Sequence, residues 1–367
     1  MNFRLLILLL ALVSLGCRRA DTNIDPNTVK DEAPTASLLT LVTHDKYTLA
    51  TIDNPWGKGV LRQYALVPRN TDLPDSLPAG AVVVRTPIQR ALVYSVVHSS
   101  LLKELGGGDA IGGVVDAMFF TDPEVGDAVK AGTIADCGSS AAPDIEKIIA
   151  LQPDAVILDT YQSFSYGQLS HTSAPVIECA DYMETTPLGR AEWVKFYGTL
   201  IGQRERADSL FNAVKESYQS TRSQCATAKR RPRVLTETVI SGIWNVPGGN
   251  SYMARLLDDA GGDYPWRDTD SAGSLNLDIT SVLATAQDAD VWLIKSFNIH
   301  TLSDLLAANA LNAEFAAYKS GNVYVCDTNR SRLYEKFPFH PDVLLREYHN
   351  IFIGKDKELI FFKRIDR

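Results

Sequence analysis

The sequence predicts an α/β protein in which two doubly wound lobes are joined by one long helix, with a β-rich extension before the first lobe. Three observations lead to this prediction. A long amphipathic pattern occupies residues 187–229, strands alternate with helices on both sides of it, and two segments of the first half reappear in the second. The chain length of 367 residues also suits two domains better than one.

The pattern in residues 187–229 is that of a single helix face. Apolar residues recur at every third or fourth position from Trp193 through Phe211 to Tyr218. Pro187 suits a first helical turn, because its missing amide hydrogen has no partner there. A helix of this length would extend about 60 Å, enough to cross two domains. Gly202 is the position where an interruption is expected, since a glycine inside a helix costs about 1 kcal/mol relative to alanine.

The segments on either side of this pattern are typical of mostly parallel, Rossmann-like sheets. We assign the first lobe to residues 87–186, the bridging helix to residues 187–229 and the second lobe to residues 230–367. First-lobe strands are expected at residues 91–95, 112–116, 134–137, 155–159 and 176–180, and helices at 99–105 and 144–151. Second-lobe strands are expected at residues 233–240, 291–295 and 323–326, and helices at 251–260, 279–284, 302–309 and 341–353. Residues 145–158 resemble residues 279–294, which supports two lobes of one design.

The N-terminus has the pattern of an export signal. Arg4 precedes an apolar run that ends at Val13, and small residues then lead to Cys17. The run is too short to span a membrane. A cysteine directly after the cleavage point resembles a bacterial lipoprotein signal, in which Cys17 is lipidated; ordinary secretion is the alternative. Residues 1–17 are therefore assigned to the signal, residues 18–35 to a flexible tether and residues 36–86 to the β-rich extension.

Composition and motifs exclude several classes of function. The formal net charge is −8 and no basic tract is present, so a nucleic-acid partner is not expected. Hydrolase, phosphate-loop and zinc-protease motifs are absent. The six histidines are scattered and the cysteines fit no zinc spacing, so neither a metal site nor a cofactor is expected. Cys137 and Cys179 lie at predicted strand ends of one lobe, where they either pair or stay buried as free thiols; both alternatives remain open.

The candidate binding residues lie in loops beyond the carboxyl ends of the predicted strands, where open α/β lobes bind ligands. These loops combine aromatic side chains with a few polar or cationic groups, which suits a large, flat, partly apolar guest. Lys295 and Arg332 are suited to pair with carboxylates. His98, at a junction of strand and helix, is suited to ligate a metal in the guest or, more simply, to cap the helix or donate a hydrogen bond. The expected binding residues are His98, Phe119, Phe120, Ser139, Ser140, Tyr161, Trp244, Asn250, Tyr252, Trp266, Lys295, Arg332 and Tyr334.

Several segments resemble the periplasmic substrate-binding proteins that serve ABC importers of iron chelates and cobalamin. Residues 86–116 are similar to the opening strand–helix–strand of that family, and residues 137–158 (CGSSAAPDIEKIIALQPDAVIL) to its most recognisable motif. The helix pattern at 193–225 and residues 337–352 also fit, so that the likeness covers about residues 87–352. The resemblance implies two lobes with little hinge motion, a guest held between them and no enzymatic activity.

The resemblance also implies one acidic residue per lobe that pairs with arginines of the permease. Glu146 matches the first of these positions. Thr280 occupies the second, which departs from the family pattern, and Asp278 lies two residues away. An exposed ion pair contributes only about 0–1 kcal/mol, so one missing acid need not prevent docking. The alternative for Glu146 is a helix N-terminal residue that the helix dipole favours.

We therefore expect a monomeric, non-catalytic protein that is lipid-anchored to a bacterial membrane on its periplasmic side. It would capture an iron siderophore, haem or cobalamin and deliver it to an ABC permease. One alternative is a two-lobed enzyme such as a chelatase, which requires a compact acid/base pair in the cleft. Another is a free-metal-ion binding protein, which requires three or four His, Asp or Glu side chains converging between the lobes.

Overall fold

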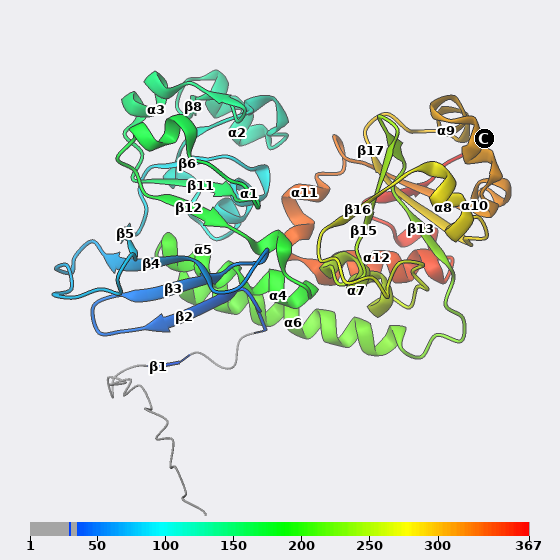
Figure 1. Cartoon of the computed structure of the whole chain (residues 1–367), viewed down its shortest axis with the longest axis horizontal. Coiled ribbons are helices and arrows are strands. Elements are labelled where there is room, and N and C mark those ends of the chain that lie inside the picture. The colour runs from blue at the N-terminus through cyan, green and yellow to red at the C-terminus, as the bar shows by residue number, and fades with distance from the viewer. Residues whose placement is uncertain (1–28, 31–34, 367) are drawn as a thin grey trace, which may run out of the picture.

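The computed structural model describes residues 29–30 and 35–366. The predicted signal with Cys17 and most of the predicted tether lie outside the described residues. Two α/β lobes stand side by side above a layer of helices, and an additional sheet lies below the first lobe (Figure 1). No helix in the described part of the chain is long and apolar enough to cross a membrane.

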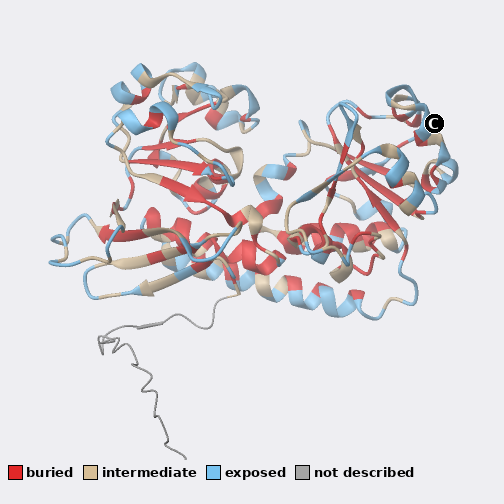
Figure 2. Cartoon of the chain, in the orientation of Figure 1, coloured by how far each residue is buried: buried red, intermediate tan, exposed pale blue. Residues whose placement is uncertain are grey.

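The first lobe is a parallel five-stranded sheet with the strand order β12-β11-β6-β7-β8. Its central strands are almost entirely buried, as expected when both faces of a parallel sheet are covered (Figure 2). Its strands are β6 (Ala91–Val93), β7 (Ile111–Val114), β8 (Ala135–Asp136), β11 (Ala155–Asp159) and β12 (Val176–Cys179), with a small hairpin of β9 (Gly138–Ser139) and β10 (Ala142–Pro143). Its helices are α1 (Val96–Glu104), α2 (Pro123–Lys130) and α3 (Ile145–Leu151). The predicted α/β fold class is confirmed, although α2 was not predicted.

The second lobe contains a four-stranded sheet with the order β13-β17-β18-β19 and a smaller antiparallel sheet, β14-β15-β16. The strands are β13 (Val234–Thr236), β14 (Val239–Ile240), β15 (Ile243–Pro247), β16 (Ser274–Leu277), β17 (Val291–Ser296), β18 (Val323–Asp327) and β19 (Phe362–Arg364). The helices are α7 (Tyr252–Asp259), α8 (Ile279–Ala286), α9 (Leu302–Ala308), α10 (Ala316–Ser320), α11 (Leu333–Lys336) and α12 (Pro341–Phe352). The single strand predicted at residues 233–240 is two strands, because Glu237 adopts a left-handed backbone with φ 63° between them.

The predicted long bridging helix is confirmed as α6 (Arg204–Cys225), although the predicted range of residues 187–229 contains three helices rather than one. They are α4 (Pro187–Glu192), α5 (Val194–Leu200) and α6. The break between α5 and α6 lies at Gly202, whose φ of +70° cannot continue a right-handed helix. Helix α5 packs against α1 of the first lobe, whereas α6 packs against α5 and against α12 of the second lobe. The lobes are therefore still joined by helices, with α6 as the element that reaches from one to the other (Figure 1).

The N-terminal sheet has the order β1-β2-β3-β4-β5, and all its pairs are antiparallel except β4-β5. Its strands are β1 (Val29–Lys30), β2 (Leu39–Thr43), β3 (Thr48–Asp53), β4 (Val60–Pro68) and β5 (Val82–Thr86). Strand β1 falls in residues 18–35, the segment predicted as a flexible tether, so two residues of that segment form a strand instead. Tyr64 joins the sheet to β12 of the first lobe: its hydroxyl donates to the Val176 carbonyl (3.1 Å) and accepts from the Glu178 amide (2.8 Å). One continuous hydrophobic core includes this sheet, the helices and both lobes.

The four cysteines of the described chain are buried free thiols: Cys137, Cys179, Cys225 and Cys326. Cys137 directly follows β8, whereas Cys179 ends β12 at the opposite edge of the same sheet. Four strand spacings of about 4.8 Å separate these edges, far beyond the ~7 Å that a disulfide tolerates between Cα atoms. Burial raises the pKa of Cys137 to about 11, so it stays a protonated thiol at neutral pH.

Candidate ligand-binding site

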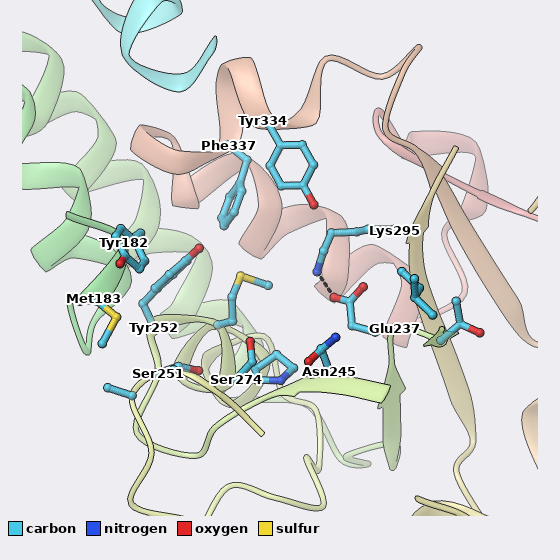
Figure 3. A pocket seen from close by; sticks show the side chains of 16 residues that line it. Tyr182, Met183, Glu237, Asn245, Ser251, Tyr252, Ser274, Lys295, Tyr334 and Phe337 are labelled. Carbon is cyan, nitrogen blue, oxygen red and sulfur yellow. Dashed lines mark hydrogen bonds and ion pairs between the residues drawn. The ribbon is translucent and has the colours of Figure 1, made fainter. Parts of the chain in front are cut away.

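A cavity of about 390 Å³ lies beyond the carboxyl ends of β13 and β17, where the second lobe meets the 3-10 turn η4 (Asp181–Met183) that follows the first-lobe sheet. We call it the inter-lobe pocket (Figure 3). Its lining residues are Tyr182, Met183, Glu237, Thr238, Ile240, Asn245, Pro247, Ser251, Tyr252, Met253, Ala272, Gly273, Ser274, Lys295, Tyr334 and Phe337. Aromatic walls with a few polar groups are the composition expected for a small-molecule site.

The charged part of the pocket is the ion pair between Lys295 and Glu237. Burial lowers the pKa of Lys295, but the charge of Glu237 outweighs burial and holds that pKa well above its usual value. Lys295 is therefore an ammonium ion in the pocket wall. The hydroxyl of Tyr334 points toward it from the opposite side (Figure 3). Glu237 reaches this place from a left-handed backbone conformation, which costs about 1–3 kcal/mol and is typical of functional sites.

The aromatic walls are held in place by hydrogen bonds. The Tyr252 hydroxyl accepts a hydrogen bond of 2.5 Å from Arg190, and the Tyr252 ring stacks on Phe337 with centroids 6.0 Å apart. The Tyr182 hydroxyl donates to the Thr160 carbonyl at 2.6 Å. Two of the rings on the pocket wall are thus fixed by contacts that do not involve a guest.

A second cavity, of about 700 Å³, lies at the carboxyl edge of the first-lobe sheet, and we call it the first-lobe pocket. Its aromatic lining comprises Tyr94, Tyr161, Phe164 and Tyr166. The two pockets are linked through neighbouring residues: Asp159 lines the first-lobe pocket, and the next residue, Thr160, holds Tyr182 of the inter-lobe pocket. The carboxyl edge of each lobe therefore presents its own pocket with aromatic lining.

A model of the periplasmic binding protein family matches residues 97–329, well over half of the chain. The chain belongs to this family. The resemblance found in the sequence is thereby confirmed, and so is the expectation of a non-catalytic protein, because this is a family of transport binding proteins and not of enzymes.

One relative of this binding protein is an uncharacterized lipoprotein of Methanocaldococcus jannaschii, 27% identical over 262 residues. The match covers 67% of this chain and 61% of the relative, so the chain spans about three fifths of that relative's length.

Solved structures share the fold. A periplasmic heme-binding protein from Pseudomonas aeruginosa has a TM-score of 0.60 at 18% identity and covers 76% of this chain and 99% of its own. A protein of an Fe3+-hydroxamate transport system from Saccharomonospora viridis has a TM-score of 0.58 at 17% identity, covering 82% of this chain and 98% of its own. A vitamin B12-binding protein of Vibrio cholerae has a TM-score of 0.53 at 16% identity, covering 73% and 99%. At these identities the likeness concerns the fold.

Five of the residues predicted for guest binding line the two pockets of the binding protein. Tyr252, Lys295 and Tyr334 meet in the inter-lobe pocket. Ser140 and Tyr161 line the first-lobe pocket. These residues stay the leading candidates for guest contact.

Three predicted aromatic residues are core residues instead. Trp244 is fully buried, stacks on Trp292 with centroids 5.7 Å apart and also packs against Phe315. Because successive strand side chains point to opposite faces, its neighbour Asn245 lines the inter-lobe pocket in its place. Trp266 and Phe120 are only 7% and 8% exposed. The assignment of these three rings to the guest is therefore corrected to packing.

The remaining predicted residues are dispersed. Phe119, Ser139 and Asn250 are exposed and are not among the residues that line the two pockets. Arg332 lies outside both pockets and pairs with Asp122 of the first lobe at 2.7 Å. This contact links the lobes, and Glu335 holds the same guanidinium group from within α11.

His98 is fully buried on α1 and does not cap that helix, whose N-cap is Ser95. Its Nε2 atom lies 3.4 Å from Asp159 Oδ1 and 3.7 Å from Asp181 Oδ1. Burial lowers the pKa of His98, but the two carboxylates outweigh burial and raise it to about 9. The capping alternative was therefore wrong, and the imidazole instead faces two acids.

Sequence reasoning missed Tyr182, Glu237 and Phe337, which line the inter-lobe pocket. Glu237 directly follows β13 and Tyr182 lies just beyond β12. Open α/β lobes bind ligands beyond the carboxyl ends of their strands, so both residues would have been candidates if the ends of these strands had been placed correctly. Phe337 follows α11 and has no comparable signal in the sequence.

The two docking candidates lie at equivalent helix starts. Glu146 is exposed in the first turn of α3, whose N-cap is Asp144. Asp278 is the N-cap of α8 and accepts hydrogen bonds from the amides of Thr280 (2.9 Å) and Ser281 (3.0 Å). The side-chain hydrogen bonds from Thr280 and Ser281 keep the pKa of Asp278 below its usual range. Asp278 thus corresponds to Asp144, and Thr280 corresponds to Glu146.

Proposed function

We propose that this periplasmic binding protein captures a bulky metal chelate or tetrapyrrole between its lobes and presents it unaltered to the permease of an ABC importer. The candidate guests are an iron siderophore, haem and cobalamin. The observation that carries the proposal is the inter-lobe pocket, which combines aromatic walls with a partly buried ion pair of the second lobe. The structural neighbours named as binding heme and vitamin B12 support the choice of guest class.

The pocket suits such a guest because its walls are formed in advance. Tyr252 and Tyr182 are held by Arg190 and by the Thr160 carbonyl, so binding orders few additional side chains. The flat rings offer apolar area to a planar or partly apolar guest. Lys295 offers a fixed positive charge to a carboxylate or hydroxamate oxygen of that guest.

Anchoring and docking complete the proposal. Lipidation of Cys17 would keep the protein, as a monomer, at the periplasmic face of the membrane. The family relative named a lipoprotein supports this anchor. Fractionation of cells into membrane and soluble periplasmic material tests it, because an unlipidated protein would be recovered in the soluble fraction.

Spectroscopic titration of the purified mature protein tests guest binding. Haem, cobalamin and a ferric hydroxamate siderophore each absorb visible light, and saturable binding of one of them with one equivalent is expected. Tyr334→Ala removes a 42% exposed ring from the pocket and should weaken binding by about tenfold. Tyr47→Ala is the matched control, because this tyrosine stacks on His44 in the turn between β2 and β3, outside both pockets. Failure of all three guests to bind, or an equal loss in both variants, would refute the proposal.

A further inference from the structure

Three potential metal ligands converge at the carboxyl edge of the first-lobe sheet, beside the first-lobe pocket. His98, Asp159 and Asp181 each offer one ligand atom, and these atoms lie within 4.8 Å of one another. Their convergence follows from the topology, since they lie beyond or at the carboxyl ends of β6, β11 and β12, which are neighbours in the sheet. In the described part of the chain no other group of three such residues meets the same criterion.

The imidazole of His98 has no hydrogen-bond partner in the described structure, although it is fully buried. Its Nε2 atom is 3.4 Å and 3.7 Å from the two carboxylate oxygens, whereas charge-assisted hydrogen bonds measure about 2.7–2.9 Å. A tetrahedral ion with bonds of about 2.0–2.1 Å holds its ligand atoms about 3.3 Å apart. The observed distances are thus closer to those between ligands of one ion than to those of a direct hydrogen bond.

Arg190 fixes one of the three ligands without using the oxygen that faces His98. Its Nε atom pairs with Asp181 Oδ2 at 2.9 Å, whereas Oδ1 is directed at the imidazole and also accepts a hydrogen bond from the Tyr197 hydroxyl at 3.4 Å. A partner of this kind orients a metal ligand from outside the coordination sphere. Because the pKa of His98 is raised, a metal ion has to displace the imidazole proton when it binds. With the imidazole then neutral, the two carboxylates and Arg190 sum to a charge of −1, which favours a cation.

The site is open on one side. His98 and Asp181 have fully buried side chains, whereas the side chain of Asp159 is 44% exposed and lines the first-lobe pocket. An ion held here would keep coordination positions directed toward the cleft. Such an ion would sit between the first-lobe pocket and the residues that anchor Tyr182 and Tyr252 of the inter-lobe pocket.

We propose that His98, Asp159 and Asp181 bind one divalent transition-metal ion beside the first-lobe pocket. Mixed imidazole and carboxylate ligands suit Zn2+, Mn2+, Fe2+ or Co2+. The site rests on these residues and not on the identity of the guest proposed above.

Cobalt titration of the chelator-treated mature protein tests the proposal. We expect one equivalent of Co2+ to produce saturable visible absorption, with Zn2+ competing for the same site. Asp159→Asn replaces a half-exposed ligand by a side chain of the same shape and should weaken Co2+ binding by about 100-fold or more. Asp116→Asn is the control, since Asp116 follows β7 in the same sheet and lies outside the cluster; it should bind Co2+ as the wild-type protein does.

The Co2+ titration and the guest titration test the metal site and the proposed function separately. Absence of saturable Co2+ binding, or equal affinity of wild type and Asp159→Asn, would overturn the metal site and leave His98 as a protonated imidazole between two acids. Circular dichroism of both variants confirms that they are folded. A wild-type protein that binds Co2+ but none of the three chromophoric guests would retain the metal site and refute the proposed function.

Discussion

Two buried carboxylates, those of Glu184 and Glu192, hold the start of the N-terminal sheet against the helical layer. Glu184 is 1% exposed and its oxygens accept hydrogen bonds from the Ser37 amide (2.9 Å), the Leu38 amide (3.0 Å) and the Trp193 indole (2.9 Å). Glu192 accepts a further hydrogen bond of 2.7 Å from the Ala36 amide. A buried carboxylate is tolerated when hydrogen bonds satisfy its oxygens in this way. If the carboxylate were removed, the groups that donate these hydrogen bonds would be left without a partner. The start of the extension is thus fixed from within the helical layer.

Glu184→Ala should therefore lower the free energy of unfolding by about 3 kcal/mol, because several donors lose a charged acceptor at once. Urea denaturation followed by circular dichroism measures this change. Glu216→Ala, on the exposed face of α6, is the control and should change stability by less than about 0.5 kcal/mol. Equal stabilities of the two variants would show that Glu184 does not hold the extension.

At the scale of elements, the bridging segment shows how one residue alters a helix pattern. Its apolar spacing continues through Gly202, yet the chain there adopts φ +70° and α5 ends before α6 begins. The turn lets α6 fold back along α5 and continue beneath the second lobe to α12. A straight helix would leave α5 without this partner.

Gly202→Ala tests the turn. A Cβ atom at this position is strained by the left-handed backbone and would lie 3.3 Å from Pro87 Cβ, so we expect a loss of about 1–2 kcal/mol in unfolding free energy. Gly126→Ala is the matched control, because Gly126 lies inside α2 and a Cβ atom there would lie 3.9 Å from the Phe120 carbonyl oxygen, an ordinary contact. That control should gain up to about 1 kcal/mol. A stabilised Gly202→Ala variant would mean that the turn is not required.

The whole molecule is held together by the helical layer and by weak bridges across the cleft. Asp122 pairs with Arg332 at 2.7 Å, and Glu104 lies 2.9 Å from the His340 imidazole. Partly exposed ion pairs of this kind contribute about 0–1 kcal/mol each. The continuous core, by contrast, spans both lobes and the extension. We therefore expect only small changes of lobe orientation when a guest binds.

Docking to the permease is tested at this scale. Glu146→Lys should leave guest affinity unchanged and impair uptake by whole cells, because Glu146 is an exposed helix residue outside both pockets. Glu205→Lys, an exposed acid in the first turn of α6, is the matched control and should not affect uptake. Guest affinity is measured on the purified protein and uptake with labelled guest in cells. Equal loss of affinity and uptake in Glu146→Lys would exclude a docking role.

The sequence by itself determined the α/β class, the two lobes and many of their strands and helices, because those depend on apolar spacing over a few neighbouring residues. It also selected Tyr252, Lys295 and Tyr334, which line the inter-lobe pocket. Only the tertiary structure decided which of two adjacent residues faces the pocket, as with Trp244 and Asn245. It alone brought together His98, Asp159 and Asp181, since strand order sets which distant loops become neighbours and no local pattern records that order.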